Sequence, residues 1–109
     1  MRVATHINDA DLSGALKSHI ERRLRFALAR FGERVGQVAV RITADGPAQS
    51  RCRISAEVLP FGRVAAEEND SDLFAAVDRA TGRIGRMVSR ELDRCRDVRV
   101  GRESVRTAA

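Results

Sequence analysis

Five arginines in the last third of the chain are spaced for binding phosphate. They follow one another at intervals of four, three, four and four residues and are Arg79, Arg83, Arg86, Arg90 and Arg94. On a helix, these intervals place the side chains within a sector of about 80° and in a row about 22 Å long. Each planar guanidinium can bind two phosphate oxygens at once. The spacing predicts a surface for a polyanion, which we call the arginine stripe; the alternative is a solvated face that promotes solubility.

The charge of the chain is concentrated in the same region. The 109 residues include 20 basic and 15 acidic side chains, for a net charge of +5. Nine arginines and only four acids lie between Arg79 and Arg106, while the residues before them hold equal numbers of bases and acids. Such asymmetry is typical of a nucleic-acid-binding surface. A bias toward arginine, with nineteen arginines and the single lysine Lys17, is the alternative explanation.

A second group of basic residues belongs to an earlier helix. Apolar residues recur at intervals of three and four from Leu16 to Phe31, which predicts a helix that starts at Ser13 and ends near Phe31. Arg22, Arg23 and Arg30 lie on one flank of its apolar stripe, together with His19 and Phe26, and Lys17 lies on the opposite flank. The candidate RNA-binding residues are therefore Lys17, Arg22, Arg23, Arg30, Arg79, Arg83, Arg86, Arg90 and Arg94. Which flank of the first helix joins the stripe stays open.

The residues that accompany the arginines favour folded RNA over other nucleic acids. The chain has no Trp or Tyr and only four Phe, so we do not expect stacking platforms for single strands. The helix expected from Ser71 to Cys95 contains neither Asn nor Gln, the side chains that read adenine in DNA. Recognition of shape and phosphate, as folded RNA presents them, is the remaining mode.

Hydrophobic alternation predicts the elements that position these helices. Strands are expected at residues 2–7, 38–43 and 51–58, and a short strand at 64–66 follows a hairpin turn at Pro60–Gly62. Asp70 or Ser71 can cap the last helix. The order β-α-β-β-β-α, with one apolar face on each element, predicts an α/β two-layer sandwich. In it, two helices cover one face of a four-stranded mixed sheet, with the first two strands parallel.

The length and hydropathy of the chain indicate a single domain. We expect an α/β domain over residues 1–96, followed by a short basic tail over residues 97–109 that is mobile. No apolar run approaches the roughly 20 residues that span a bilayer, and the first residues lack the apolar segment of a secretory signal. These features predict a cytoplasmic protein with no membrane contact.

Residues suited to catalysis or metal binding do not form a recognisable site. Cys52 and Cys95 are too far apart for a zinc motif, and each falls on an apolar position of its element. His6 and His19 have no neighbouring nucleophile in the sequence. The acidic run at residues 67–72 lacks the ligand spacing of a calcium loop, so a helix cap and a solvated turn are expected there. We therefore expect no enzyme activity, catalytic residue, metal, cofactor or small-molecule substrate.

Two segments resemble the ribosome hibernation promoting factors, short stationary-phase proteins that bind the small ribosomal subunit. The run from Asp72 to Asp78 with the following arginines Arg83, Arg86 and Arg90 is similar to that family's second helix. The segments Ser13–Lys17, Ile20 and Arg23-Leu24 are similar to its first helix, and the hairpin at Pro60–Gly62 and the order of elements also match. The resemblance covers about residues 2–95.

The resemblance implies a protein that lodges in the mRNA and tRNA channel of the small subunit and inhibits translation under stress. Its rRNA contacts carry over to Lys17, Arg23, Arg83, Arg86, Arg90 and Arg94. Phe26 and Leu92 stand where family members often have a basic residue, and Phe74 replaces a Tyr. The tail after Asp97 is too short to be the dimerising domain of the family's long form, so we expect a monomer when bound.

Three hypotheses of different classes follow. The first is a ribosome-binding translation inhibitor that acts by occupancy, with rRNA of the small subunit as its partner. The second is a protein–protein regulatory module that uses the exposed sheet face, with Arg41, Thr43, Arg53 and Ser55 as its surface. The third is an enzyme.

Overall fold

The structure is a computed structural model. It describes the backbone of residues 1–7, 13–44, 49–60 and 62–108, and the side chains of the same residues up to Arg94 except Ser13 and Ala44. The elements in chain order are β1 (Arg2–Ile7), α1 (Ser13–Leu28), the 3₁₀ segment η2 (Ala29–Arg34), β2 (Val35–Ala44), β3 (Ser50–Val58), β4 (Gly62–Asp70) and α2 (Leu73–Ala108).

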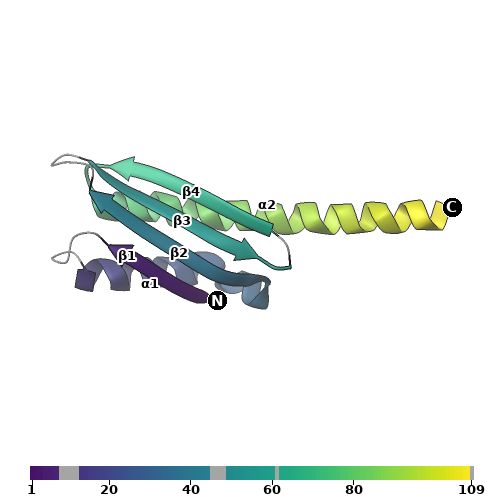
Figure 1. Cartoon of the computed structure of the whole chain (residues 1–109), viewed down its shortest axis with the longest axis horizontal. Coiled ribbons are helices and arrows are strands. Elements are labelled where there is room, and N and C mark those ends of the chain that lie inside the picture. The colour runs from purple at the N-terminus through teal and green to yellow at the C-terminus, as the bar shows by residue number, and fades with distance from the viewer. Residues whose placement is uncertain (8–12, 45–48, 61, 109) are drawn as a thin grey trace.

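The four strands form one mixed sheet in the order β1-β2-β3-β4. β1 pairs with β2 in parallel, and the other two pairs are antiparallel. Both helices lie on the same face of this sheet, as Figure 1 shows, with α2 packed on β3 and β4 and α1 beside it. The expected α/β two-layer sandwich, including its parallel first pair, is confirmed.

The core lies between the sheet and the two helices. Every second residue is buried there from Val38 to Ile42 of β2 and from Cys52 to Val58 of β3, as the alternation predicts. From the helices, residues at intervals of three and four complete it, among them Leu16, Ile20 and Leu24 of α1 and Val77, Ile84 and Val88 of α2. Cys52 is fully buried in this core, as expected, whereas the side chain of Cys95 lies outside the described ones.

Several boundaries differ from those expected. α1 ends at Leu28 rather than near Phe31, and the 3₁₀ segment η2 follows, in which Gly32 adopts a φ of 56°, a conformation that no α-helix contains. β2 begins three residues earlier than expected, at Val35, and a bulge lies between Val35 and Val38. β4 is a nine-residue strand that contains residues 67–70, so the acidic run is mostly strand and not a turn.

α2 begins and ends at other residues than the sequence predicted. Its cap is Asp72, whose Oδ1 accepts the backbone N–H of Phe74 at 3.0 Å. Asp70 instead accepts the N–H of Asp72 at 2.8 Å, one step before the helix. At the other end α2 continues to Ala108 rather than stopping near Cys95, and Figure 1 shows this part beyond the sheet. Mobility of the tail stays a prediction.

Close packing between the helices depends on Gly85. A Cβ added to this residue would lie 3.3 Å from the carbonyl oxygen of Ala27 and 3.5 Å from its Cβ. The two helices are closely packed here, and a side chain at position 85 would require the backbone at Ala27 to shift. This contact fixes which flank of α1 faces α2. In the part of the chain that is described, neither helix is apolar over a length that would cross a membrane.

Candidate nucleic-acid interface

The arginine stripe lies on the flank of α2 that faces the edge strand β4. Arg79 Nη2 lies 2.8 Å from Asp70 Oδ2, and Arg83 Nη1 lies 3.1 Å from Glu68 Oε1. Each of these two arginines also donates a hydrogen bond to a β4 carbonyl, of Asn69 at 3.0 Å and of Glu67 at 3.3 Å. The N-terminal part of the stripe is thus anchored to the sheet.

The ion pair at the start of the stripe perturbs both of its partners. The pKa of Asp70 is lowered, mainly because the backbone N–H of Asp72 donates to its carboxylate and also because Arg79 does. The pKa of Arg79 is raised, with the hydrogen bond to Asp70 as the main cause. The Asp70 carboxylate and the Arg79 guanidinium stabilise each other in their charged forms. Arg79 is therefore paired within the protein before any phosphate binds.

The far end of the stripe is also paired. Arg94 Nε donates to Glu91 Oε2 at 3.2 Å, and its Nη2 donates to the other carboxylate oxygen, which makes the contact bidentate. Glu91 lies outside the 80° sector of the stripe but is three residues before Arg94, and side chains three apart on a helix are neighbours. Glu91 therefore neutralises part of the positive charge at this end of the stripe, although it lies outside the stripe's sector.

Arg86 and Arg90 are the remaining members of the stripe. Both are exposed, and within the described residues neither forms an ion pair or a hydrogen bond. Arg86 Nη1 lies 3.7 Å from the point that a Cβ on Gly82 would occupy, so its guanidinium lies along the outer side of α2. Among the described side chains, the stripe therefore comprises three paired arginines and two adjacent ones that have no partner there.

The first helix presents its Arg22, Arg23 and Arg30 flank toward α2, which answers the question that the sequence left open. His19 Nε2 donates to Asp78 Oδ1 of α2 at 2.7 Å, and Arg23 Nε lies 3.3 Å from the same oxygen. Asp78 is on the α1-facing flank of α2, whereas the stripe is on the β4-facing flank. The two basic groups thus flank the outer surface of α2 and do not form one row. Lys17, although exposed, belongs to neither group.

An exposed aromatic ring lies within the α1 basic group. Phe26 is 82% exposed, and the guanidinium of Arg23 lies 6.0 Å from its ring centroid. Arg30 lies 4.6 Å from the ring centroid of Phe31. The low aromatic content therefore did not predict this exposed ring. The position of Phe26 outside the apolar stripe of the first helix did indicate that its side chain is exposed.

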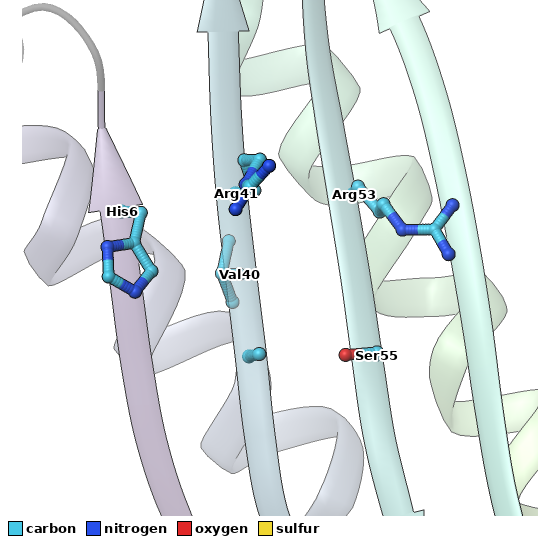
Figure 2. A pocket seen from close by; sticks show the side chains of 6 residues that line it. His6, Val40, Arg41, Arg53 and Ser55 are labelled. Carbon is cyan, nitrogen blue, oxygen red and sulfur yellow. The ribbon is translucent and has the colours of Figure 1, made fainter.

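The opposite face of the sheet has a shallow pocket of its own, shown in Figure 2. Its volume is about 410 Å³, and it is lined by His6, Ala39, Val40, Arg41, Arg53 and Ser55. His6, Arg41 and Arg53 are consecutive partners in the register of β1, β2 and β3. Arg53 Nη1 lies 3.4 Å from Glu67 Oε2, so the basic row across this face is partly neutralised.

Groups that could support catalysis or hold a metal do not assemble in the described part of the chain. His19 has Asp78 as its partner and packs edge-on against Phe74 at 5.0 Å between ring centroids, which is a structural role at the α1–α2 contact. No three His, Cys, Asp or Glu side chains among the described residues are grouped to bind an ion. The geometry favours binding of a ligand through charge.

The comparison with protein families agrees with this geometry. Residues 3–96 match the family described as Sigma 54 modulation protein / S30EA ribosomal protein. The chain belongs to this family. The S30EA family is one of ribosome-associated hibernation and modulation factors, so the resemblance seen in the sequence is confirmed. No curated protein matches the chain.

Solved structures share the fold of this S30EA family member. The N-terminal domain of Protein Y from Thermus thermophilus is 28% identical, with a TM-score of 0.70 over 83% of this chain and 98% of that one. A ribosomal subunit interface protein from Coxiella burnetii is 14% identical, with a TM-score of 0.72 over 85% of this chain and 99% of that one. The second likeness concerns the fold alone.

Proposed function

We propose that this chain binds the small ribosomal subunit through rRNA phosphates and occupies the channel used by mRNA and tRNA, so that translation stops during stress. It acts in the cytoplasm as a monomer and by its bulk, with no chemical step. The observation that carries the proposal is the pair Arg86 and Arg90, which are exposed and without partners among the described residues of an S30EA family member. Two adjacent free guanidiniums repel each other, and a phosphodiester backbone relieves that repulsion.

The paired arginines contribute differently. Arg79, Arg83 and Arg94 are exposed, whereas their carboxylate partners are only 13–26% exposed, and ion pairs near the surface are worth roughly 0–1 kcal/mol each. A phosphate can replace the carboxylate if its binding offsets the free energy of the ion pair that is lost. These three arginines therefore contact RNA only after they release their carboxylate partners. Arg86 and Arg90 bind phosphate without any such exchange, and Arg22 and Arg30 add the contribution of α1. We therefore place Arg86 and Arg90 at the centre of the interface.

Charge reversal at the two free arginines tests the proposal. Arg86→Glu/Arg90→Glu is expected to abolish co-sedimentation with purified small subunits and to leave the thermal melt nearly unchanged, because no described ion pair is lost. The matched control is Arg41→Glu/Arg63→Glu, which makes the same change in net charge on strands β2 and β4. The proposal is wrong if the Arg86/Arg90 variant pellets with subunits as the wild type does.

The second candidate is a contact with a protein partner through the open sheet face. The pocket around His6, Arg41 and Arg53 favours it, and its charge fits an acidic segment. The same two variants separate the candidates. Loss of binding only with Arg41→Glu/Arg63→Glu would show that the interface is on the sheet. Our proposal instead predicts loss of binding only with Arg86→Glu/Arg90→Glu.

Occupancy of the channel needs its own measurement. Added protein should inhibit translation of a reporter mRNA by purified ribosomes, and excess mRNA and initiator tRNA should displace it from small subunits. Inhibition without such competition would place the binding surface elsewhere on the ribosome. The Arg86→Glu/Arg90→Glu variant serves as the inactive control.

A further inference from the structure

Phe26 is the least buried of the large apolar side chains described. Its ring is 82% exposed, twice the 41% of Phe74. Single exposed apolar residues are ordinary in soluble proteins, so exposure alone has no functional meaning. The surroundings of the ring are what distinguish this position.

Arginines surround Phe26 within one helical turn on either side. Arg22 and Arg23 precede it by four and three residues, and Arg30 follows it by four. Residues at these intervals lie on the same side of a helix. The Arg23 guanidinium is 6.0 Å from the ring centroid, within range of a cation–π contact. The exposed ring of Phe26 therefore lies between the exposed Arg22 and Arg30, beside the half-buried Arg23 that pairs with Asp78; we call this surface the Phe26 patch.

The chemistry of the patch restricts its occupant. An apolar protein surface that covered the ring would remove water from the neighbouring guanidiniums and give them no anion in return, which costs free energy. A second copy of the chain would bring like charges together. A nucleotide satisfies both parts of the patch, because its base has a π-face for the ring and its phosphates are ligands for the arginines.

We propose that Phe26 is a stacking platform for an unpaired base of ribosomal RNA, with Arg22 and Arg30 on the flanking phosphates. This inference rests on the proposed function and adds a contact that phosphate binding alone does not require. Stacking on an aromatic ring tolerates any base, so the platform selects an extruded nucleotide and not a sequence. A stacking contact also gives Phe26 a role in RNA binding at a position where members of this family often have a basic residue.

Three substitutions at one position test the platform. Phe26→Ala and Phe26→Leu are expected to weaken binding to purified small subunits by about 5- to 150-fold, which corresponds to the loss of one base–aromatic stack. Phe26→Tyr should bind like the wild type. Because the ring is exposed, all three should melt like the wild type. Wild-type affinity of Phe26→Leu would show that the ring is not used.

A fluorescent reporter provides an independent readout. The chain has no Trp, so Phe26→Trp introduces a single indole, and stacking on a base should quench it when small subunits are added. Gln37→Trp, at an exposed position of β2, is the matched control and should keep its fluorescence. Equal quenching at both positions, or none at position 26, would overturn the inference.

The outcomes separate this inference from the proposed function. If Arg86→Glu/Arg90→Glu abolishes binding while every Phe26 variant binds normally, the platform is wrong and the phosphate interface stands. If the Arg86/Arg90 variant also binds normally, the proposed interface itself is wrong. Concentration-dependent dimers of the free protein that Phe26→Ala abolishes would assign the patch to self-association and also overturn the inference.

Discussion

His19 of α1 donates a hydrogen bond to Asp78 of α2 at 2.7 Å, and this contact holds an acid between the two basic groups. Arg23 lies 3.3 Å from the same carboxylate oxygen. Asp78 thus neutralises part of the charge that α1 brings to the helix surface, while it joins the two helices. It favours the fold and opposes the binding of phosphate.

The conflict between these two effects can be measured with Asp78→Asn, which keeps the shape and one acceptor oxygen but removes the charge. We expect binding to small subunits to tighten by a few fold, since a unit charge at about 4 Å in water is worth roughly 1 kcal/mol. The free energy of unfolding should fall by less than about 1 kcal/mol. Weaker binding by this variant would mean that Arg23 needs its carboxylate to be positioned.

Gly82 and Gly85, two of the glycines of α2, predict opposite results for substitution. Near Gly82, the nearest atom to an added Cβ is Arg86 Nη1 at 3.7 Å, so Gly82→Ala meets no obstacle. It should stabilise the protein by up to about 1 kcal/mol through helix propensity. Gly85→Val should destabilise it, because a side chain there would collide with the backbone of Ala27. Thermal melts of both variants check this, and a stable Gly85→Val protein would contradict the close helix contact.

Asp70 should contribute to stability in a pH-dependent way. Its pKa is lowered below the ordinary 3.8 in the folded state, chiefly by the N–H of Asp72. The contribution is therefore fully present above the unfolded value and is lost as the pH falls through the lower folded value. Asp70→Asn should melt below the wild type at neutral pH, and the difference should vanish in acid. A difference that is the same at every pH would exclude this role.

Cys52 should be unreactive in the native protein. Burial raises the pKa of its thiol from 9.0 to about 12, and the thiolate is the reactive form. In a Cys95→Ser background, iodoacetamide at about pH 8 should modify Cys52 only after guanidinium chloride unfolds the chain. Because thiolate formation is suppressed by folding, stability should decline as the pH rises above 9.0. Rapid native modification would contradict the burial of Cys52.

The sheet and the two layers could be predicted from the sequence because alternation reports directly on burial. Val38, Val40 and Ile42 are all buried on the helix-facing side of β2, as their spacing indicated. The ends of the helices were harder to predict from the sequence. α1 gives way to a 3₁₀ segment after Leu28 although apolar residues continue at helical intervals to Phe31, and Asp72 rather than Asp70 caps α2 because β4 extends through Asp70.

Whether each arginine of the stripe is paired with a carboxylate depends on the tertiary structure and could not be predicted from the spacing. Arg79 and Arg83 are paired because their flank of α2 faces β4, whose side chains alternate between the two faces of the sheet. Glu68 therefore points toward α2, whereas Glu67 lies within 3.4 Å of Arg53 on the open face. Periodicity placed the stripe on one side of the helix, but it does not specify which neighbour that side meets.

The salt dependence of binding tests the central claim most directly. The logarithm of the affinity for purified small subunits should fall linearly with the logarithm of the salt concentration between about 50 and 200 mM. Arg86→Gln/Arg90→Gln should reduce the magnitude of that slope by about 2, one for each lost phosphate contact. Arg41→Gln/Arg63→Gln should leave it unchanged. An α2 variant with the wild-type slope would show that these two arginines do not bind phosphate.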